Sequence, residues 1–264
     1  MDNETEKISI LKFTEKGSSS IEDVVAKEFP LIIILNNQQL VTLLCSPANL
    51  KYLAVGFLFS EGFLKSKNEI KKIMVDDRRG VVWVETEKGE ELADDVLLER
   101  FITSGCGRGT SFYSAADAQG QVKVESQIKI SALEVLALVS EFQHRSQVYR
   151  ATGGVHSAAL CDNKDILVFS EDIGRHNAID KIFGECVLND IATGDHIIIT
   201  SGRISSEILL KVAKRNVPII VSKSAPTNLG VRLANDLGVT LVGFVRGKRM
   251  NVYTHDGRIT SDGK

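Results

Sequence analysis

Cys106 has the most unusual surroundings of the four cysteines in this chain of 264 residues. It lies in the segment TSGCGRGTS at residues 103–111, which has glycine at positions 105, 107 and 109. Glycines leave the thiol uncrowded and let the backbone approach a ligand closely. Arg108 favours the thiolate, because a neighbouring cation lowers the pKa of a thiol. The segment predicts a sulfur nucleophile at Cys106, with an inert cysteine in a glycine-rich turn as the alternative.

Basic and hydroxyl side chains follow three predicted strands, in the segments 201–203, 222–227 and 246–249. The carboxyl ends of parallel strands share one sheet edge, where α/β proteins bind ligands. Residues 203–249 carry nine basic and two acidic side chains, a net charge of +7 in a chain of net charge −2. We therefore expect a phosphate-bearing ligand at this edge. The residues expected to hold it are Arg203, Ser222, Lys223, Arg246, Lys248 and Arg249.

The other bases and the histidines of this half are given structural interpretations. Lys211, Lys214 and Arg215 are expected on exposed helix faces. His156 and His176 are interpreted as structural histidines, with metal ligation as the alternative, although their spacing matches no zinc signature. The common nucleotide-binding fingerprints are absent, since there is no Walker loop and no strand is followed by G-x-G-x-x-G.

Alternating helices and short apolar strands position the basic segments. We predict strands at 166–169, 196–200, 217–221 and 239–245, and helices at 176–188, 204–216 and 227–237. Such an alternation indicates a buried, largely parallel sheet. A capping box formed by Ser131 and Glu134 opens a further helix that runs to about residue 144.

The first half of the chain has an α+β pattern. We predict a strand at 7–13, hairpins at 31–35/40–45 and 70–75/81–86, and a helix with Ser46 as its N-cap, Pro47 at its first position and Gly62 at its end. These elements predict a smaller α+β domain at 1–130, carrying the Cys106 segment, and an α/β domain at 131–264. The acidic stretch 85–99 is interpreted as a solvated face, with a docking surface as the alternative.

The composition excludes several classes of protein. The chain is 43% hydrophobic and 25% charged, as in ordinary globular proteins. Its net charge of −2 is close to neutral and does not indicate a nucleic acid or a membrane as a partner. The uncharged stretch 29–50 is interrupted by NNQQ at 36–39, which fits a hairpin better than a membrane span. Cys45, Cys161 and Cys186 have core-like neighbours, and no C-x-x-C pair is present, so we expect buried thiols and a cytoplasmic protein.

Several motifs, in order along residues 45–255, resemble the formate dehydrogenase accessory protein family (FdhD). They are EG at 61–62, TGGVHSA at 152–158, EDIGRHNAIDK at 171–181, TSGR at 200–203, SKSAPT at 222–227 and GFVRG at 243–247. The resemblance implies a three-layer core similar to cytidine deaminases, a smaller added domain and a homodimer. It also implies a sulfur carrier that accepts sulfur from a cysteine desulfurase as a persulfide. The sulfur then passes to the molybdenum bis(molybdopterin guanine dinucleotide) cofactor, before the cofactor enters formate dehydrogenase.

The resemblance assigns the persulfide to Cys106 and the cofactor site to residues Phe244, Val245, Arg246, Gly247, Lys248 and Arg249. The family often has C-x-x-C at the reactive segment, whereas this chain has glycine at position 109. We therefore expect Cys106 to act alone, without a tightly held metal. Two other functions stay open: a metal-dependent hydrolase using Cys106, His156 or His176, and a chaperone that binds the cofactor without moving sulfur.

Overall fold

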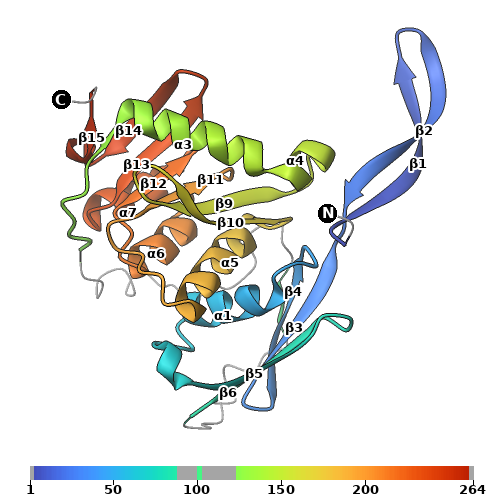
Figure 1. The fold of residues 1–264 in the computed structure, drawn as a ribbon, viewed down its shortest axis with the longest axis horizontal. Coiled ribbons are helices and arrows are strands. Elements are labelled where there is room, and N and C mark those ends of the chain that lie inside the picture. Colours follow the sequence, from blue (N-terminus) through green and yellow to red (C-terminus); the bar gives the residue numbers. More distant parts are fainter. Residues whose placement is uncertain (1–2, 88–99, 103–122, 262–264) are drawn as a thin grey trace.

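A mixed six-stranded sheet forms the centre of the C-terminal half in this computed structural model, which describes residues 3–87, 100–102 and 123–261 (Figure 1). Its strand order is β10-β9-β11-β12-β13-β14. The bounds are β9 His156–Cys161, β10 Ile166–Asp172, β11 Ile197–Thr200, β12 Ile219–Ser222, β13 Thr240–Arg246 and β14 Arg249–Thr254. Only β11, β12 and β13 run parallel, and β9, β10 and β14 pair antiparallel. The expectation of a largely parallel sheet is therefore wrong for the outer strands, which are joined by hairpins rather than by crossover helices.

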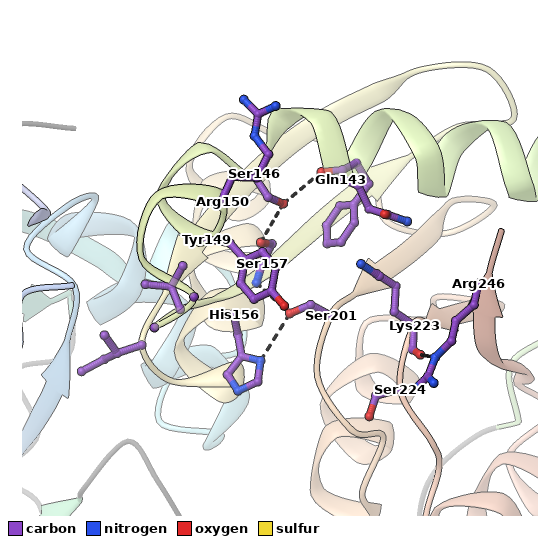
Figure 2. Close-up of a pocket in the computed structure, with 15 residues that line it drawn as sticks. Gln143, Ser146, Tyr149, Arg150, His156, Ser157, Ser201, Lys223, Ser224 and Arg246 are labelled. Carbon is purple, nitrogen blue, oxygen red and sulfur yellow. Dashed lines mark hydrogen bonds between the residues drawn. The ribbon is translucent and has the colours of Figure 1, made fainter. Parts of the chain in front are cut away.

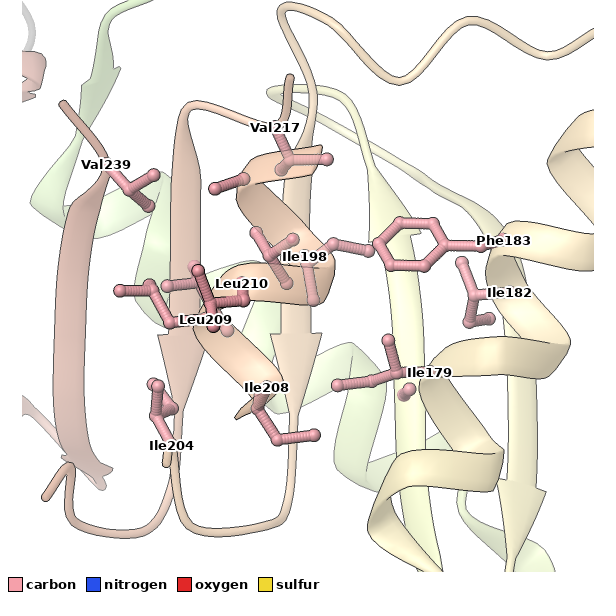
Figure 3. Packing of buried hydrophobic residues seen from close by; sticks show 14 of the residues in the cluster. Ile179, Ile182, Phe183, Ile198, Ile204, Ile208, Leu209, Leu210, Val217 and Val239 are labelled. Atoms are coloured by element: carbon pink, nitrogen blue, oxygen red, sulfur yellow. The ribbon is translucent and has the colours of Figure 1, made fainter. Parts of the chain in front are cut away.

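Helices cover both faces of this sheet, which confirms the predicted α/β architecture. One face packs against α5 (Arg175–Leu188), α6 (Ser206–Lys214) and α7 (Asn228–Asp236), and the other against α3 (Ala132–Arg145). Figure 3 shows Ile179 and Phe183 of α5 and Ile208 of α6 within the first of these cores. A short helix, α4 (Gln147–Thr152), follows α3 and precedes β9. The likeness to cytidine deaminases stays a prediction.

A second sheet, with strand order β5-β6-β3-β4-β7, forms the N-terminal layer. It contains β3 (Phe29–Leu35), β4 (Gln38–Cys45), β5 (Ile70–Asp76), β6 (Val81–Thr86) and β7 (Arg100–Ile102), and it packs against α1 (Leu50–Ser60). The short helix η1 (Lys67–Glu69) leads into β5. Both predicted hairpins are confirmed, and Asn36 and Asn37 form the first turn with positive φ angles. Asparagine tolerates this left-handed conformation, which a tight hairpin turn requires.

Two glycines bring α1 and α5 into backbone contact. A Cβ atom on Gly56 would lie 1.8 Å from the carbonyl oxygen of Asp180, and one on Gly184 would lie 1.9 Å from that of Tyr52. Neither position has room for a side chain. The N-terminal layer is thereby held against the C-terminal half through α1, the only long helix of this layer among the described residues. The predicted domain boundary at 130/131 stays a prediction.

The ends of the chain add smaller elements. Strands β1 (Thr5–Thr14) and β2 (Gly17–Ala26) form a two-stranded hairpin that projects from the body (Figure 1). The predicted strand 7–13 is confirmed within it, whereas β2, with its SSS run, was not predicted. Strands β8 (Ile130–Ser131) and β15 (Ile259–Thr260) pair in parallel near η3 (Asp256–Arg258). No helix in the described ranges is long and apolar enough to cross a membrane.

Two predicted helix caps had different outcomes. Ser131 and Glu134 form the expected capping box at α3. Ser46 does not cap α1, because the helix starts later, with Asn49 in the N-cap position. The Ser46 hydroxyl instead accepts a hydrogen bond from the backbone N–H of Ile173, and its own N–H donates to Asp172. The long-range contact with the β10–α5 turn takes precedence over the local cap.

Candidate functional site

A pocket of about 510 Å³ opens beside the ends of β11, β12 and β13. Its volume lies within the usual range of small-molecule sites. One wall comes from the end of α3, from α4 and from the turn after α4, and the other comes from the strand-end segments (Figure 2). The lining residues are Phe142, Gln143, Ser146, Tyr149, Arg150, Gly153, Gly154, Val155, His156, Ser157, Ile173, Ser201, Lys223, Ser224 and Arg246.

Hydrogen bonds tie two of the strand-end segments together. The hydroxyl of Ser222 donates to the carbonyl oxygen of Gly202 at 2.7 Å and accepts from the N–H of Ser224 at 2.9 Å. Ser222 is fully buried, so its hydroxyl organises the loops without reaching the pocket. The predicted convergence of these segments at one sheet edge is confirmed.

Two cations line the strand-end wall of the pocket. The guanidinium Nε of Arg246 donates to the carbonyl oxygen of Lys223 at 3.4 Å, and its carbon lies 5.5 Å from the ring centre of Phe244. Partial burial, followed by the charge of Arg246, lowers the pKa of Lys223. Both positive charges line the same pocket, and an anion bound there would relieve their mutual repulsion. Figure 2 places both side chains across the pocket from Tyr149 and His156.

His156 lies on the opposite side, at the start of β9. Its Nδ1 is 3.3 Å from the hydroxyl oxygen of Ser201, which also accepts the N–H of Ser157 at 3.0 Å. Burial, followed by the charge of Arg175, lowers the pKa of His156. The imidazole is therefore neutral at pH 7 and offers one donor and one acceptor rather than a charge.

Glu171 lies behind the pocket wall at the end of β10. Its carboxylate accepts the backbone N–H groups of Val148 and Tyr149, each at 3.0 Å, and the hydroxyl of Ser157 at 3.3 Å. Although these hydrogen bonds favour the charged form, burial outweighs them and raises the pKa of Glu171. The short helix α4 is thereby attached to the central sheet.

Two buried ion pairs hold the N-terminal layer next to this region. Lys181 lies 2.7 Å from Asp172, and both side chains are fully buried. Both also bind the backbone of Ser46, since the N–H of Ser46 donates to Asp172 at 3.0 Å and Lys181 donates to the carbonyl oxygen of Ser46 at 3.4 Å. Lys211 lies 2.7 Å from Asp180 and 3.3 Å from Glu61, so it joins α6, α5 and the end of α1. The expectation that Lys211 is an exposed helix residue is wrong, because three helices meet over its ammonium group.

His176 forms a separate pair outside the pocket lining. Its Nε2 lies 3.1 Å from a carboxylate oxygen of Glu207, at the start of α6. This contact is the main reason why the pKa of Glu207 is lowered. Among the described residues, no group of three or more His, Cys, Asp or Glu side chains is placed to hold a metal ion.

Comparison with known proteins identifies the family. The sequence profile of the FdhD/NarQ family matches residues 26–260. The chain belongs to the FdhD/NarQ family. "Sulfur carrier protein FdhD" of Bacillus subtilis (strain 168) is 45% identical over 250 residues, which cover 95% of each chain. The protein of the same name from Staphylococcus aureus (strain Newman) is 41% identical over 252 residues, covering 95% of this chain and 94% of the other.

A solved structure has the same fold as this chain. It is the crystal structure from Desulfotalea psychrophila that is described as a formate dehydrogenase accessory protein. The two chains are 28% identical and superimpose with a TM-score of 0.80, covering 97% of this chain and 99% of the other. The resemblance inferred from the motifs is thereby confirmed.

The structure brings only some of the predicted FdhD/NarQ site residues to the pocket. Lys223 and Arg246 line it, whereas Arg203, Lys248 and Arg249 do not. Val245 is buried in the core, Gly247 forms the β13–β14 turn with φ of 58°, and Phe244 stacks against Arg246. Cys106 lies outside the described residues. Cys45, Cys161 and Cys186 are buried as expected, and burial raises the pKa of each to about 12.

The α4 wall is the part of the site that was not predicted. Tyr149 and Arg150 come from a helix of six residues, too short for a periodic pattern to reveal. Only Gly153 and Gly154, just before His156, marked this segment, and their place at the start of the TGGVHSA motif was the available signal.

Proposed function

We propose that this protein is a sulfur carrier for formate dehydrogenase maturation. The observation that carries the proposal is its 45% identity, over 95% of both chains, to a protein named sulfur carrier protein FdhD. The Desulfotalea psychrophila structure supports the link to formate dehydrogenase through its description. Cytoplasmic location fits the three free, buried thiols, since free cysteines persist in reducing compartments.

The carried sulfur is a persulfide on Cys106. The Cys106 thiolate attacks the outer sulfur of a persulfide on a cysteine desulfurase, a new S–S bond forms, and the desulfurase cysteine leaves as a thiolate. No net oxidation or reduction accompanies this exchange, so one sulfur nucleophile is enough. Glycine at position 109 therefore does not prevent the step.

The acceptor is the molybdenum bis(molybdopterin guanine dinucleotide) cofactor, bound as a client before its insertion into formate dehydrogenase. We assign a phosphate-bearing end of this ligand to the pocket that Lys223 and Arg246 line. Lysine and arginine side chains are suited to phosphate oxygens, and the neutral His156 and the hydroxyl of Ser201 offer hydrogen bonds to a heterocycle. Phe244, Lys248 and Arg249 belong to the same β13–β14 hairpin as Arg246 and complete the proposed cofactor segment. A homodimer is the proposed assembly.

Incubation with a cysteine desulfurase and cysteine, followed by intact-protein mass spectrometry, tests the carrier. We expect an adduct of about 32 Da on Cys106 that is removed by a reducing thiol. Cys106→Ala should lose the adduct and fail to restore formate dehydrogenase, whereas Cys161→Ser should keep both, because the buried thiol of Cys161 has a pKa of about 12. A protein that binds the cofactor and restores the enzyme without any adduct would be a chaperone instead.

A further inference from the structure

We infer that Glu171 is a positioning residue of the ligand pocket, acting as a substitute N-cap for α4. This inference rests on the proposed function, because it concerns the pocket assigned to the phosphate-bearing ligand. Glu171 does not line that pocket itself. It acts through the helix that forms one pocket wall.

The helix α4 needs an external partner. It has six residues, and isolated helices of this length are unstable in water, because the first turn costs more entropy than its few hydrogen bonds return. The first N–H groups of any helix also lack partners within the helix. A serine at the N-cap usually accepts one of them. Here the N-cap residue, Ser146, makes no such bond, since its hydroxyl donates to the carbonyl oxygen of Phe142 instead.

Glu171 supplies the missing acceptors from a different element. It belongs to β10, and its two carboxylate oxygens accept the N–H groups of Val148 and Tyr149 separately, each at 3.0 Å. A negative charge at a helix N-terminus is further stabilised by the helix dipole. The carboxylate therefore fixes both the position and the direction of α4 on the edge of the sheet.

The same carboxylate also binds a residue that lines the pocket, Ser157. It accepts the hydroxyl of Ser157, whose oxygen lies 2.9 Å from that of Ser146, and the N–H of Ser157 donates to Ser201. Glu171 thus contacts two lining residues directly, Tyr149 and Ser157. Ser157 in turn contacts two more, Ser146 and Ser201. Loss of the carboxylate would release the α4 wall relative to Lys223 and Arg246.

The test compares Glu171→Gln with Glu185→Gln in the full-length protein. Glutamine keeps the size of the side chain but offers a single acceptor oxygen, so one amide of α4 loses its partner. We expect amide hydrogen exchange at Val148 and Tyr149 to become about tenfold faster, and the Kd for GDP, used as the probe, to rise about tenfold in calorimetry. Glu185, a half-buried glutamate of α5 that does not line the pocket, is the matched control and should change neither value.

The outcomes separate this inference from the proposed function. If Glu171→Gln binds GDP with the wild-type Kd, the positioning role is refuted, since a merely structural role lowers stability without changing the affinity of the folded protein. If the wild type itself does not bind GDP, the ligand assignment of the pocket fails, and unchanged amide exchange in the variant would still refute the substitute cap. Ser157→Ala serves as the second variant if Glu171→Gln does not fold, with an expected rise in Kd of about threefold.

Discussion

The ammonium group of Lys211 lies 2.7 Å from a carboxylate oxygen of Asp180, with both side chains buried between three helices. The hydroxyl of Ser60 donates to the same carboxylate, and Glu61 lies 3.3 Å from the ammonium group. Although burial alone would lower it, the charges of Asp180 and Glu61 raise the pKa of Lys211. Lys211 therefore stays charged, and it links the N-terminal layer to α5 and α6.

Removing one partner of this pair should destabilise the fold strongly. Lys211→Met leaves the Asp180 carboxylate buried without its cation, and such a change typically costs about 3–5 kcal/mol. Denaturant unfolding measures the loss. Lys51→Met is the control, because Lys51 is an exposed residue of α1 and a surface change of this kind stays within about 0.5 kcal/mol. Equal stability of the two variants would contradict the structural role of Lys211.

Substitution at the α1–α5 contact should be disruptive for steric reasons. Gly56→Ala places a methyl group 1.8 Å from the carbonyl oxygen of Asp180, so the helices must separate. We expect a loss of at least about 1–3 kcal/mol, typical of overpacked cores, and a lower Tm. Gly257→Ala is the control, since nothing lies within 4 Å of its added methyl group. A wild-type Tm for Gly56→Ala would show that the two helices are farther apart in solution.

Acid should destabilise the protein in part through His156. Its pKa is lowered from 6.5 in the folded state, so on acidification the unfolded chain binds a proton first. The free energy of unfolding should therefore fall as the pH drops below about 6.5, and His156→Gln should lose part of this slope. Urea titrations at a series of pH values measure it. Identical slopes in both proteins would mean that His156 titrates normally.

Anion binding should depend on the position of the positive charges rather than on their number. Lys223→Ala and Arg246→Ala each remove a cation that lines the pocket, and each should raise the Kd for GDP about tenfold, with a weaker dependence on salt. Lys72→Ala removes the same charge from an exposed site on β5 and should leave the Kd unchanged. If all three variants weaken binding equally, the attraction is nonspecific.

Local signals in the sequence predicted most of the elements. The capping box of Ser131 and Glu134, the Asn36-Asn37 turn and the apolar strands each depend on neighbours in the chain, and the structure contains them all. Lys223 and Arg246 could also be placed together, because the topology of parallel strands brings their segments to one edge.

Contacts between distant residues account for what was missed. Lys211 was expected to be exposed because its partners, Asp180 and Glu61, are 31 and 150 positions away and no periodic pattern links them. Ser46 has the local features of an N-cap, but Asp172 and Ile173 occupy its polar groups. The helix α4 forms with help from Glu171, which lies on a different strand.

The missing side chains at Gly56 and Gly184 have a mechanical consequence. Two helices that touch through their main chains cannot roll over one another as side-chain layers can, because any rotation drives a carbonyl oxygen into the opposite backbone. The contact between α1 and α5 is therefore rigid and does not act as a hinge. Any movement of one described element past another is therefore expected away from this pair of helices.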